Sequence, residues 1–120
     1  MNALLIVDVQ NDFCPGGALE VPNGDHVVPV INRLTSQFDN IIQTQDWHPE
    51  GHFSFASSHS GKNPFDTVQM DYGEQVLWPD HCVQGSKGAQ FHPDLNTIPT
   101  DLIIRKGFRK EIDSYSAFFE

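Results

Sequence analysis

The sequence has little positive charge, no long apolar run and little cysteine. Only 7 basic residues stand against 16 acidic ones, for a formal net charge of −9, and such a surface repels the phosphates of nucleic acids and anionic lipids. The longest apolar run, residues 3–7, is too short to span a bilayer and lacks the basic flank and cleavage site of a signal peptide. We therefore expect a cytoplasmic protein that binds neither nucleic acid nor membrane.

The two cysteines, Cys14 and Cys82, are well separated in the chain. Without an export signal, free thiols are more common than a disulfide for such a pair. Each thiol also invites a nucleophile hypothesis. Cys14 lies in a Pro-Gly-Gly loop without a neighbouring histidine, and Cys82 adjoins His81, but adjacent side chains usually point apart. We expect neither cysteine to be a nucleophile.

Apolar runs at residues 3–7, 40–45 and 101–105 predict three strands. The first run shows no alternation, which is typical of a strand buried on both faces of a parallel sheet. A turn-rich loop over 14–24 then leads to a helix, with Asp25 as its N-cap. Apolar residues follow at helical spacing: Val27, Val30, Ile31, Leu34 and Phe38.

The order of these elements predicts the fold class. A chain of 120 residues is one domain or part of one. Strand, helix, strand, long connection and strand form an α/β arrangement with a right-handed crossover and a parallel sheet. Residues 47–100 show little periodicity, and long ordered connections of this kind tend to be functional. Residues 112–119 are compatible with the start of a helix.

Three ionisable residues stand at the ends of the predicted strands: Asp8, Asp46 and Lys106. The carboxyl ends of parallel strands meet at one edge of a sheet, where open α/β proteins bind their ligands. One interpretation is that Asp8 simply ends its strand. The other is that it acts as a general base or as a charge that orients a base. Lys106 is either a solvated lysine or a charge that holds a neighbouring carboxylate ionised.

A second group of residues offers metal ligands: Asp46, His48, His52 and His81. Asp46 and His48 are two residues apart, so they face the same side in extended backbone. Carboxylate and imidazole suit Zn, Mn or Fe(II); the alternative is a surface turn that carries these residues by accident. Aromatic residues nearby either fill the core or hold a flat aromatic substrate: Phe13, Trp47, Phe53, Phe55 and Trp78.

Separated segments of the chain, taken in order, resemble the motifs of one known family. They read ALLIVDVQNDFCPGG from Ala3, QDWHP from Gln45, WPDHCV from Trp78, KG from Lys106 and DSYSAF from Asp113. They resemble the nicotinamidase/pyrazinamidase family of isochorismatase-like cysteine hydrolases. The resemblance implies a three-layer, Rossmann-like α/β fold with a parallel sheet. It also implies hydrolysis of nicotinamide to nicotinate and ammonia, with pyrazinamide as a second substrate.

The resemblance also implies roles for the catalytic and substrate-binding residues. The family uses a triad of Asp, Lys and Cys, and its first two members match Asp8 and Lys106. Phe13 and Trp78 match aromatic residues that flank the pyridine ring. The family nucleophile lies well downstream of the Lys106 position. Residues 1–120 are therefore expected to be the N-terminal part of a single isochorismatase-like domain, with the C-terminal part absent, and to be inactive alone.

The metal site of the family matches Asp46, His48 and His81, and the ion positions the pyridine ring. Zinc is the first expectation, with Fe or Mn as alternatives. His52 matches a position that supplies a further ligand in some members. The competing functions are a related cysteine amidohydrolase of the same fold, a metal-dependent hydrolase that uses bound water, and, for the isolated chain, an inactive metal-binding half-domain. The expected partners are a small-molecule substrate and either the missing C-terminal part or a second copy.

Overall fold

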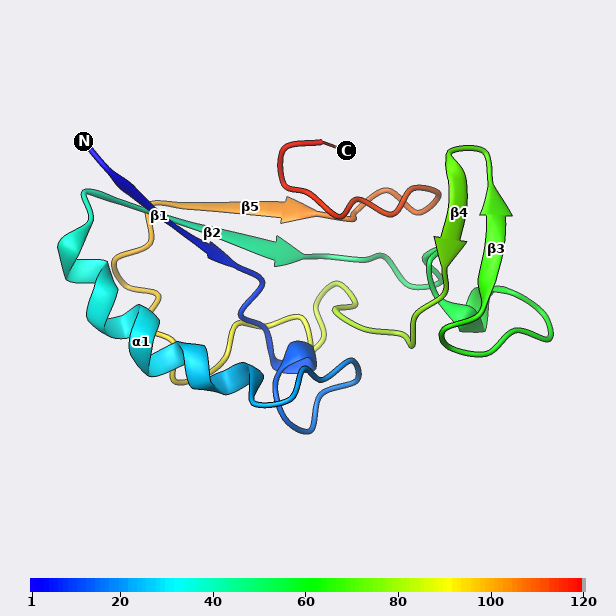
Figure 1. Cartoon of the computed structure of the whole chain (residues 1–120), viewed down its shortest axis with the longest axis horizontal. Coiled ribbons are helices and arrows are strands. Elements are labelled where there is room, and N and C mark those ends of the chain that lie inside the picture. The colour runs from blue at the N-terminus through cyan, green and yellow to red at the C-terminus, as the bar shows by residue number, and fades with distance from the viewer. Residues whose placement is uncertain (120) are drawn as a thin grey trace.

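A parallel sheet of three strands forms the centre of the computed structural model, which describes residues 1–119. The strands are β1 (Ala3–Val7), β2 (Asn40–Asp46) and β5 (Leu102–Lys106), in the order β1-β2-β5 (Figure 1). Each strand starts and ends within one residue of the run that predicted it, so the α/β fold with a parallel sheet is confirmed. The carboxyl ends of all three strands point toward the loop-rich half of the molecule (Figure 1).

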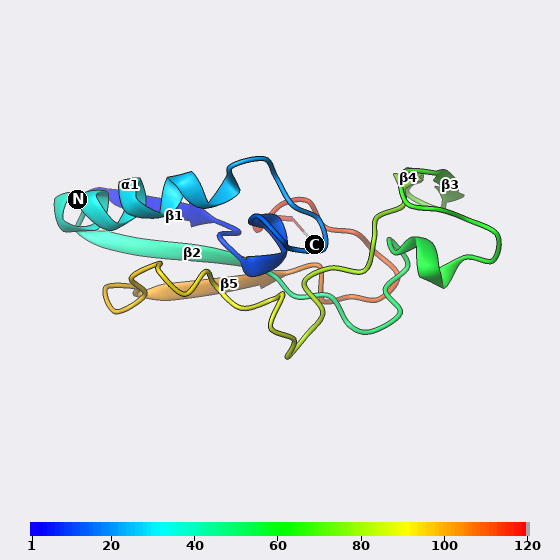
Figure 2. The same cartoon turned by 90° about the horizontal axis from the view of Figure 1, so that it is seen from below.

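Helix α1 (Val27–Leu34) lies along one face of this sheet (Figures 1 and 2). Its Val28 packs into a buried apolar cluster with Ile6 of β1, Ile41 of β2 and Leu95 of the long connection. This cluster forms the core between the helix and the sheet, and it packs against the strands from one side only. None of the helices within residues 1–119 is long and apolar enough to cross a bilayer.

The helix begins differently from the prediction. Asp25 lies inside a 3-10 helix, η2 (Gly24–His26), that runs directly into α1, so the N-cap position falls on His26, whose side chain makes no capping hydrogen bond. The Asp25 prediction was wrong because this turn lengthens the helical entry by three residues. Two further 3-10 helices, η1 (Asn11–Phe13) and η3 (Thr35–Gln37), follow β1 and α1.

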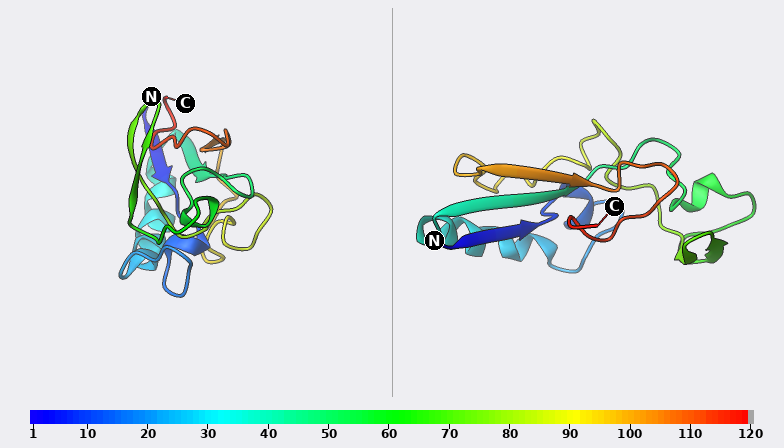
Figure 3. Two further views of the ribbon diagram at one scale, coloured as in Figure 1. Left: turned by 90° about the vertical axis from the view of Figure 1, so that its right-hand side faces the viewer. Right: turned by 90° about the horizontal axis from the view of Figure 1, so that it is seen from above.

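The face of the sheet opposite α1 is open in the described chain (Figure 3). Successive strand residues point to opposite faces; Ile6, on the helix side, is 3% exposed, whereas Val7 is 58% exposed. Leu5 and Leu102 both align with Ile42 on the open face and are exposed as well. β1 also ends the sheet, with β2 as its partner. The prediction that β1 is buried on both faces is therefore wrong for this chain by itself.

The long connection contains regular structure that the sequence did not predict. The 3-10 helix η4 (Ala56–Ser58) precedes an antiparallel hairpin of β3 (Thr67–Met70) and β4 (Gly73–Val76), which stands at one end of the molecule (Figure 1). Strands of only four residues are too short to give a clear periodic signal.

The expected helix over 112–119 is absent from the structure. The hydroxyl of Ser114 donates to the carbonyl oxygens of Ser116 and Phe119, and Ser116 and Phe119 form an isolated bridge. Such local bonds from a serine side chain compete with helical hydrogen bonding. The segment instead turns back as a loop.

We predict that the 120-residue chain alone associates through β1 and the open face. Covered apolar surface contributes about 25 cal/mol per Å², and an unpaired strand edge is a template for further pairing. Val7→Lys should reduce association in sedimentation velocity because it places a charge on that face. Val21→Lys is the matched control, since Val21 is 53% exposed but lies in a loop. A wild-type chain that stays monomeric and unfolds cooperatively would contradict this prediction.

Candidate metal centre and active-site pocket

A pocket of about 220 Å³ lies at the carboxyl ends of the three strands. It is lined by residues from segments that are far apart in the sequence. Its lining includes the predicted catalytic residues, the two aromatic residues expected to flank the substrate ring, and the predicted metal ligands other than His52: Asp8, Phe13, Asp46, His48, Trp78, His81 and Lys106. The fold therefore brings the predicted site residues to one place.

Asp46, His48 and His81 form a group that could hold a metal ion. All three are buried, and one potential ligand atom from each lies within 4.8 Å of the other two. The Nε2 atoms of His48 and His81 lie 3.5 Å and 3.8 Å from Oδ2 of Asp46. One carboxylate oxygen and two imidazole nitrogens therefore converge on one point.

The other ring nitrogen of each histidine is held by the backbone. Nδ1 of His48 donates to the carbonyl oxygen of Gly107, and Nδ1 of His81 donates to that of Pro79, both at 2.8 Å. A carbonyl oxygen only accepts, so each Nδ1 carries the proton and each Nε2 is directed toward Asp46. Histidine ligands of metals usually donate the N–H of their other ring nitrogen to a neighbouring acceptor in this way. The three side chains therefore fit a divalent ion.

His52 lies beside this group but does not belong to it. Its ring is 4.4 Å from the ring of His48, between centroids, and is fully buried. Its Nε2 faces the carbonyl oxygens of Arg109 and Ile112, at 2.8 and 3.1 Å, while its Nδ1 accepts from Ser54. Burial, together with the nearby His48, lowers its pKa. Both ring nitrogens are thus engaged in holding the segment that follows β5, and His52 is not placed as a ligand.

Lys106 connects Asp8, the other predicted catalytic residue, to Asp46 of the metal group. Its Nζ lies 2.8 Å from Oδ2 of Asp8 and also contacts Oδ1 of Asp46. Burial would lower the pKa of this ammonium group, but the charges of Asp46 and Asp8 outweigh burial and raise it. Lys106 is therefore a permanent cation between two carboxylates.

The pKa values within the metal group are set by the same balance. Burial would raise the pKa of Asp46, but its close contacts with the imidazoles of His48 and His81 and the charge of Lys106 hold it well below its usual range. Burial would lower the pKa of His48, but the ionised Asp46 raises it above the ordinary value. Asp46 is consequently an anion that faces a cation on one side and two imidazoles on the other.

Asp8 and Asp46 are each held by a neighbour on another segment. Asp8 has a positive φ of 51°, and its Oδ1 accepts a 2.6 Å hydrogen bond from the hydroxyl of Thr44. The fully buried Gln10 accepts from the N–H of Asp46 and donates to its carbonyl oxygen, both at 2.8 Å. No role for Gln10 was predicted from the sequence; its position three residues after the end of the first strand was the available signal.

Two of the five aromatic candidates line the pocket, and the other three do not. Phe13 and Trp78 line the pocket, and the ring of Phe13 lies 5.7 Å from that of His81. Phe55 is fully buried, with its ring 5.5 Å from those of both His48 and His81, so it is core filling behind the metal group. Trp47 stacks instead with the guanidinium of Arg105, 3.8 Å from its centroid.

Four other residues line the pocket without having been predicted there: Leu19, Asp113, Ser114 and Tyr115. Tyr115 accepts hydrogen bonds from Trp78 and from Gln75 of β4, and Gln75 also donates to Asp113. The available signal was the DSYSAF motif, which contributed to the resemblance without a role for any of its members.

Comparisons with known proteins identify the family of the chain. Residues 2–120 match the isochorismatase domain family, and the chain belongs to that family. A nicotinamidase from Acinetobacter baylyi is 60% identical over 118 residues, which are 98% of this chain and 55% of the relative. The chain spans about half the length of the curated relatives that it matches.

Solved structures agree with this assignment. The Acinetobacter baumanii nicotinamidase/pyrazinamidase superimposes with a TM-score of 0.93 at 59% identity, over 96% of this chain and 56% of that one. A pyrazinamidase of Pyrococcus horikoshii, solved in complex with zinc, gives a TM-score of 0.72 at 38% identity, over 97% and 57%.

We predict that Gly107→Ala weakens metal binding by at least about tenfold, the lower end of the effect of disturbing a ligand's support. A Cβ atom at Gly107 would lie 2.5 Å from Cε1 and 2.7 Å from Nδ1 of His48, so the imidazole must move. Gly61→Ala is the matched control: its φ of +73° is close to the +66° of Gly107, but nothing lies within 4 Å. Competition with a zinc chelator measures both affinities, and equal affinities would disprove the prediction.

Proposed function

We propose that the protein containing this chain hydrolyses the carboxamide of nicotinamide, and of pyrazinamide, to the carboxylate and ammonia. The observation that carries the proposal is one buried ammonium, Lys106, in contact with both Asp8 and Asp46 within a pocket that also holds a group of metal ligands. The names of the relatives support the substrate class.

We also propose that residues 1–120 form the N-terminal part of a single isochorismatase-like domain. The length of the relatives supports this, as do the open sheet face and the free edge of β1. The remaining part, or a second copy, would cover these surfaces. The full-length protein, as the term is used for the experiments below, is residues 1–120 joined to that remaining part. We place the reaction in the cytoplasm, where unpaired thiols persist, and infer that its product nicotinate serves NAD salvage.

Amide hydrolysis needs a strong nucleophile and a stabilised oxyanion. We infer that the nucleophile is a cysteine in the remaining part of the domain. Asp8 accepts the thiol proton, and the thiolate attacks the carboxamide carbon. The proton then passes to the departing nitrogen, which leaves as ammonia, and water hydrolyses the thioester to the carboxylate and the free thiol. Lys106 favours the thiolate by its charge and orients Asp8 through their 2.8 Å contact.

We infer that Asp46, His48 and His81 hold a divalent ion. Zinc has the best support because imidazole and carboxylate suit it and because the Pyrococcus relative was solved with zinc; Fe and Mn are the alternatives. Bound there, the ion supplies a Lewis-acid contact for the ring nitrogen of a pyridine. Phe13 and Trp78 flank the ring and place its carboxamide for attack.

The alternative functions are a related cysteine amidohydrolase of the same fold and, for residues 1–120 alone, an inactive metal-binding half-domain. The positions of the two cysteines favour the second alternative for the isolated chain. Both are buried, and neither lines the pocket. Burial and Asp25 raise the pKa of Cys14, while burial and the charge of Asp46 raise that of Cys82 well above its usual range. The surroundings of both thiols therefore disfavour the thiolate, which is the nucleophilic form.

We predict that Asp8→Asn in the full-length protein lowers kcat for nicotinamide by about 10²–10⁴-fold, the usual contribution of a general base. Metal content should stay unchanged because Asp8 is outside the ligand group. Ammonia release measures turnover, and elemental analysis measures the metal. Asp71→Asn, an exposed residue in the turn of the hairpin, should leave both values unchanged. Retained turnover in Asp8→Asn would remove Asp8 from the role of base.

We predict that changing Cys14 and Cys82 to Ala leaves the amidase activity of the full-length protein mostly intact. The backbone N–H of residue 82, which donates to the carboxylate of Asp12, survives the change. Circular dichroism and metal analysis confirm that the variant is folded and loaded. Loss of ammonia release by folded, metal-loaded Cys82→Ala would instead make His81 and Cys82 a catalytic pair.

A further inference from the structure

The backbone of residue 82 connects the two histidines of the metal group. The N–H of His48 donates to the carbonyl oxygen of Cys82 at 3.0 Å, and Cys82 directly follows His81. Cys82 has a positive φ of 46°, a conformation that residues other than glycine adopt only when their surroundings impose it. The orientation of both imidazoles therefore depends on what holds this one residue.

The side chain of Asp12 holds the backbone of Cys82 by a hydrogen bond. Its Oδ2 accepts a 2.7 Å hydrogen bond from the N–H of Cys82, and its Oδ1 accepts one from the N–H of Ala18 at 3.1 Å. A carboxylate makes stronger bonds to backbone N–H groups than a neutral acceptor does. The two carboxylate oxygens thus join the loop after β1 to the loop that carries His81.

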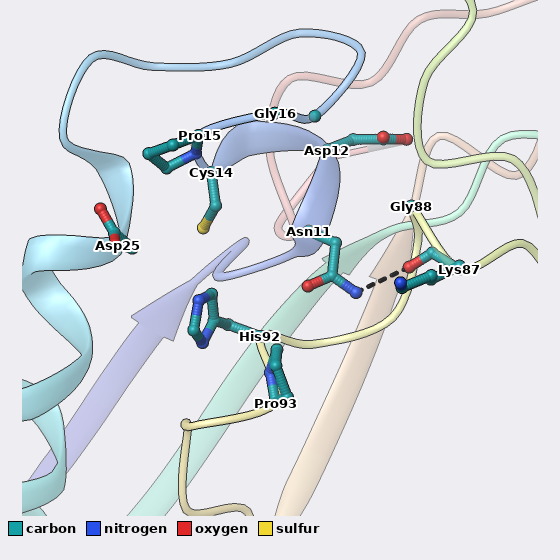
Figure 4. Close-up of a pocket in the computed structure, with 11 residues that line it drawn as sticks. Asn11, Asp12, Cys14, Pro15, Gly16, Asp25, Lys87, Gly88, His92 and Pro93 are labelled. Atoms are coloured by element: carbon teal, nitrogen blue, oxygen red, sulfur yellow. Dashed lines mark hydrogen bonds between the residues drawn. The ribbon is translucent and has the colours of Figure 1, made fainter.

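Asp12 is itself fixed by its surroundings. Its N–H donates to the carbonyl oxygen of Gly88 at 3.0 Å, and its own carbonyl oxygen accepts from the N–H of the pocket residue Leu19, also at 3.0 Å. A Cβ atom at Gly88 would overlap the Asp12 carboxylate, so only glycine leaves room for it. Figure 4 shows Asp12 above Gly88, with its carboxylate directed away from the Cys14 side chain.

We propose that Asp12 is a positioning residue for the metal centre: its carboxylate, seated over Gly88, holds the backbone of Cys82 and thereby aims His81 and His48 at the ion. The inference rests on the metal-centred site of the proposed function. Asp12 does not touch the ligand nitrogens; it acts through the peptide that connects the two ligand-bearing segments.

The test uses the full-length protein and measures zinc affinity by chelator competition and the visible spectrum of the Co(II)-loaded form. Asp12→Asn and Asp12→Ala should weaken zinc binding by about 10- to 100-fold, the usual effect of removing a residue that supports a ligand, and should alter the Co(II) bands. Asp25→Asn is the matched control. It also removes one carboxylate charge, but from the wall of a neighbouring cavity, which Figure 4 shows. It should change neither measurement.

Gly88→Ala supplies a second, independent test because it displaces the carboxylate without removing it. It should weaken zinc binding in the wild-type background and have no further effect in the Asp12→Ala background, where the new methyl group meets no carboxylate. Equal effects in both backgrounds would overturn the proposal. If Asp12→Ala fails to fold by circular dichroism, the same comparison is made in the Asp12→Asn background, where the Gly88→Ala effect should be smaller than in the wild type.

The readouts separate this proposal from the proposed function. Wild-type zinc affinity and Co(II) bands in Asp12→Asn would overturn the positioning role alone. A full-length protein that binds zinc in an Asp12-dependent manner but releases no ammonia from nicotinamide would overturn the proposed function alone. A wild-type protein that binds no divalent ion would overturn both.

Discussion

The contact of one buried ammonium with two carboxylates is the interaction on which the rest of the site depends. Lys106 is 6% exposed and lies between Asp8 and Asp46. Each of these charges would be costly to bury alone, and the removal of one partner leaves an uncompensated buried charge. Asp46 and Lys106 are direct partners in the register of β2 and β5, while Asp8 follows β1. The pairing of the parallel strands therefore sets the geometry of the site.

The candidate metal ligands face the second oxygen of the same Asp46 carboxylate, so the proposed catalytic pair and the proposed metal ligands share one anion. The rigidity of this group comes from backbone carbonyls behind its imidazoles and from polar side chains on neighbouring loops. Glycine is required where a ligand ring comes close to the backbone, as at Gly107 against His48. The geometry of the pocket at this edge of the sheet thus rests on loop residues as much as on the strands.

The sequence predicted the strands and the three strand-end charges because a short segment that carries consecutive apolar residues and ends at an ionisable residue is a local signal. It could not predict the role of His52. Whether a buried histidine binds a metal depends on which atoms face its nitrogens, and the carbonyl of Arg109 is 57 positions away. The same holds for Gln10, whose partner Asp46 lies on another strand. The hairpin was missed because its strands are only four residues long, and the loop over 112–119 was missed because local hydrogen bonds of Ser114 determine it.

X-ray absorption at the zinc edge of the loaded full-length protein tests the central claim most directly. The structure predicts two imidazole nitrogens at about 2.0–2.1 Å together with oxygen ligands from Asp46 and water, and the same shell in a His52→Gln variant. A third imidazole that disappears in His52→Gln, or a sulfur ligand at about 2.3 Å, would contradict the claim that Asp46, His48 and His81 are the protein ligands.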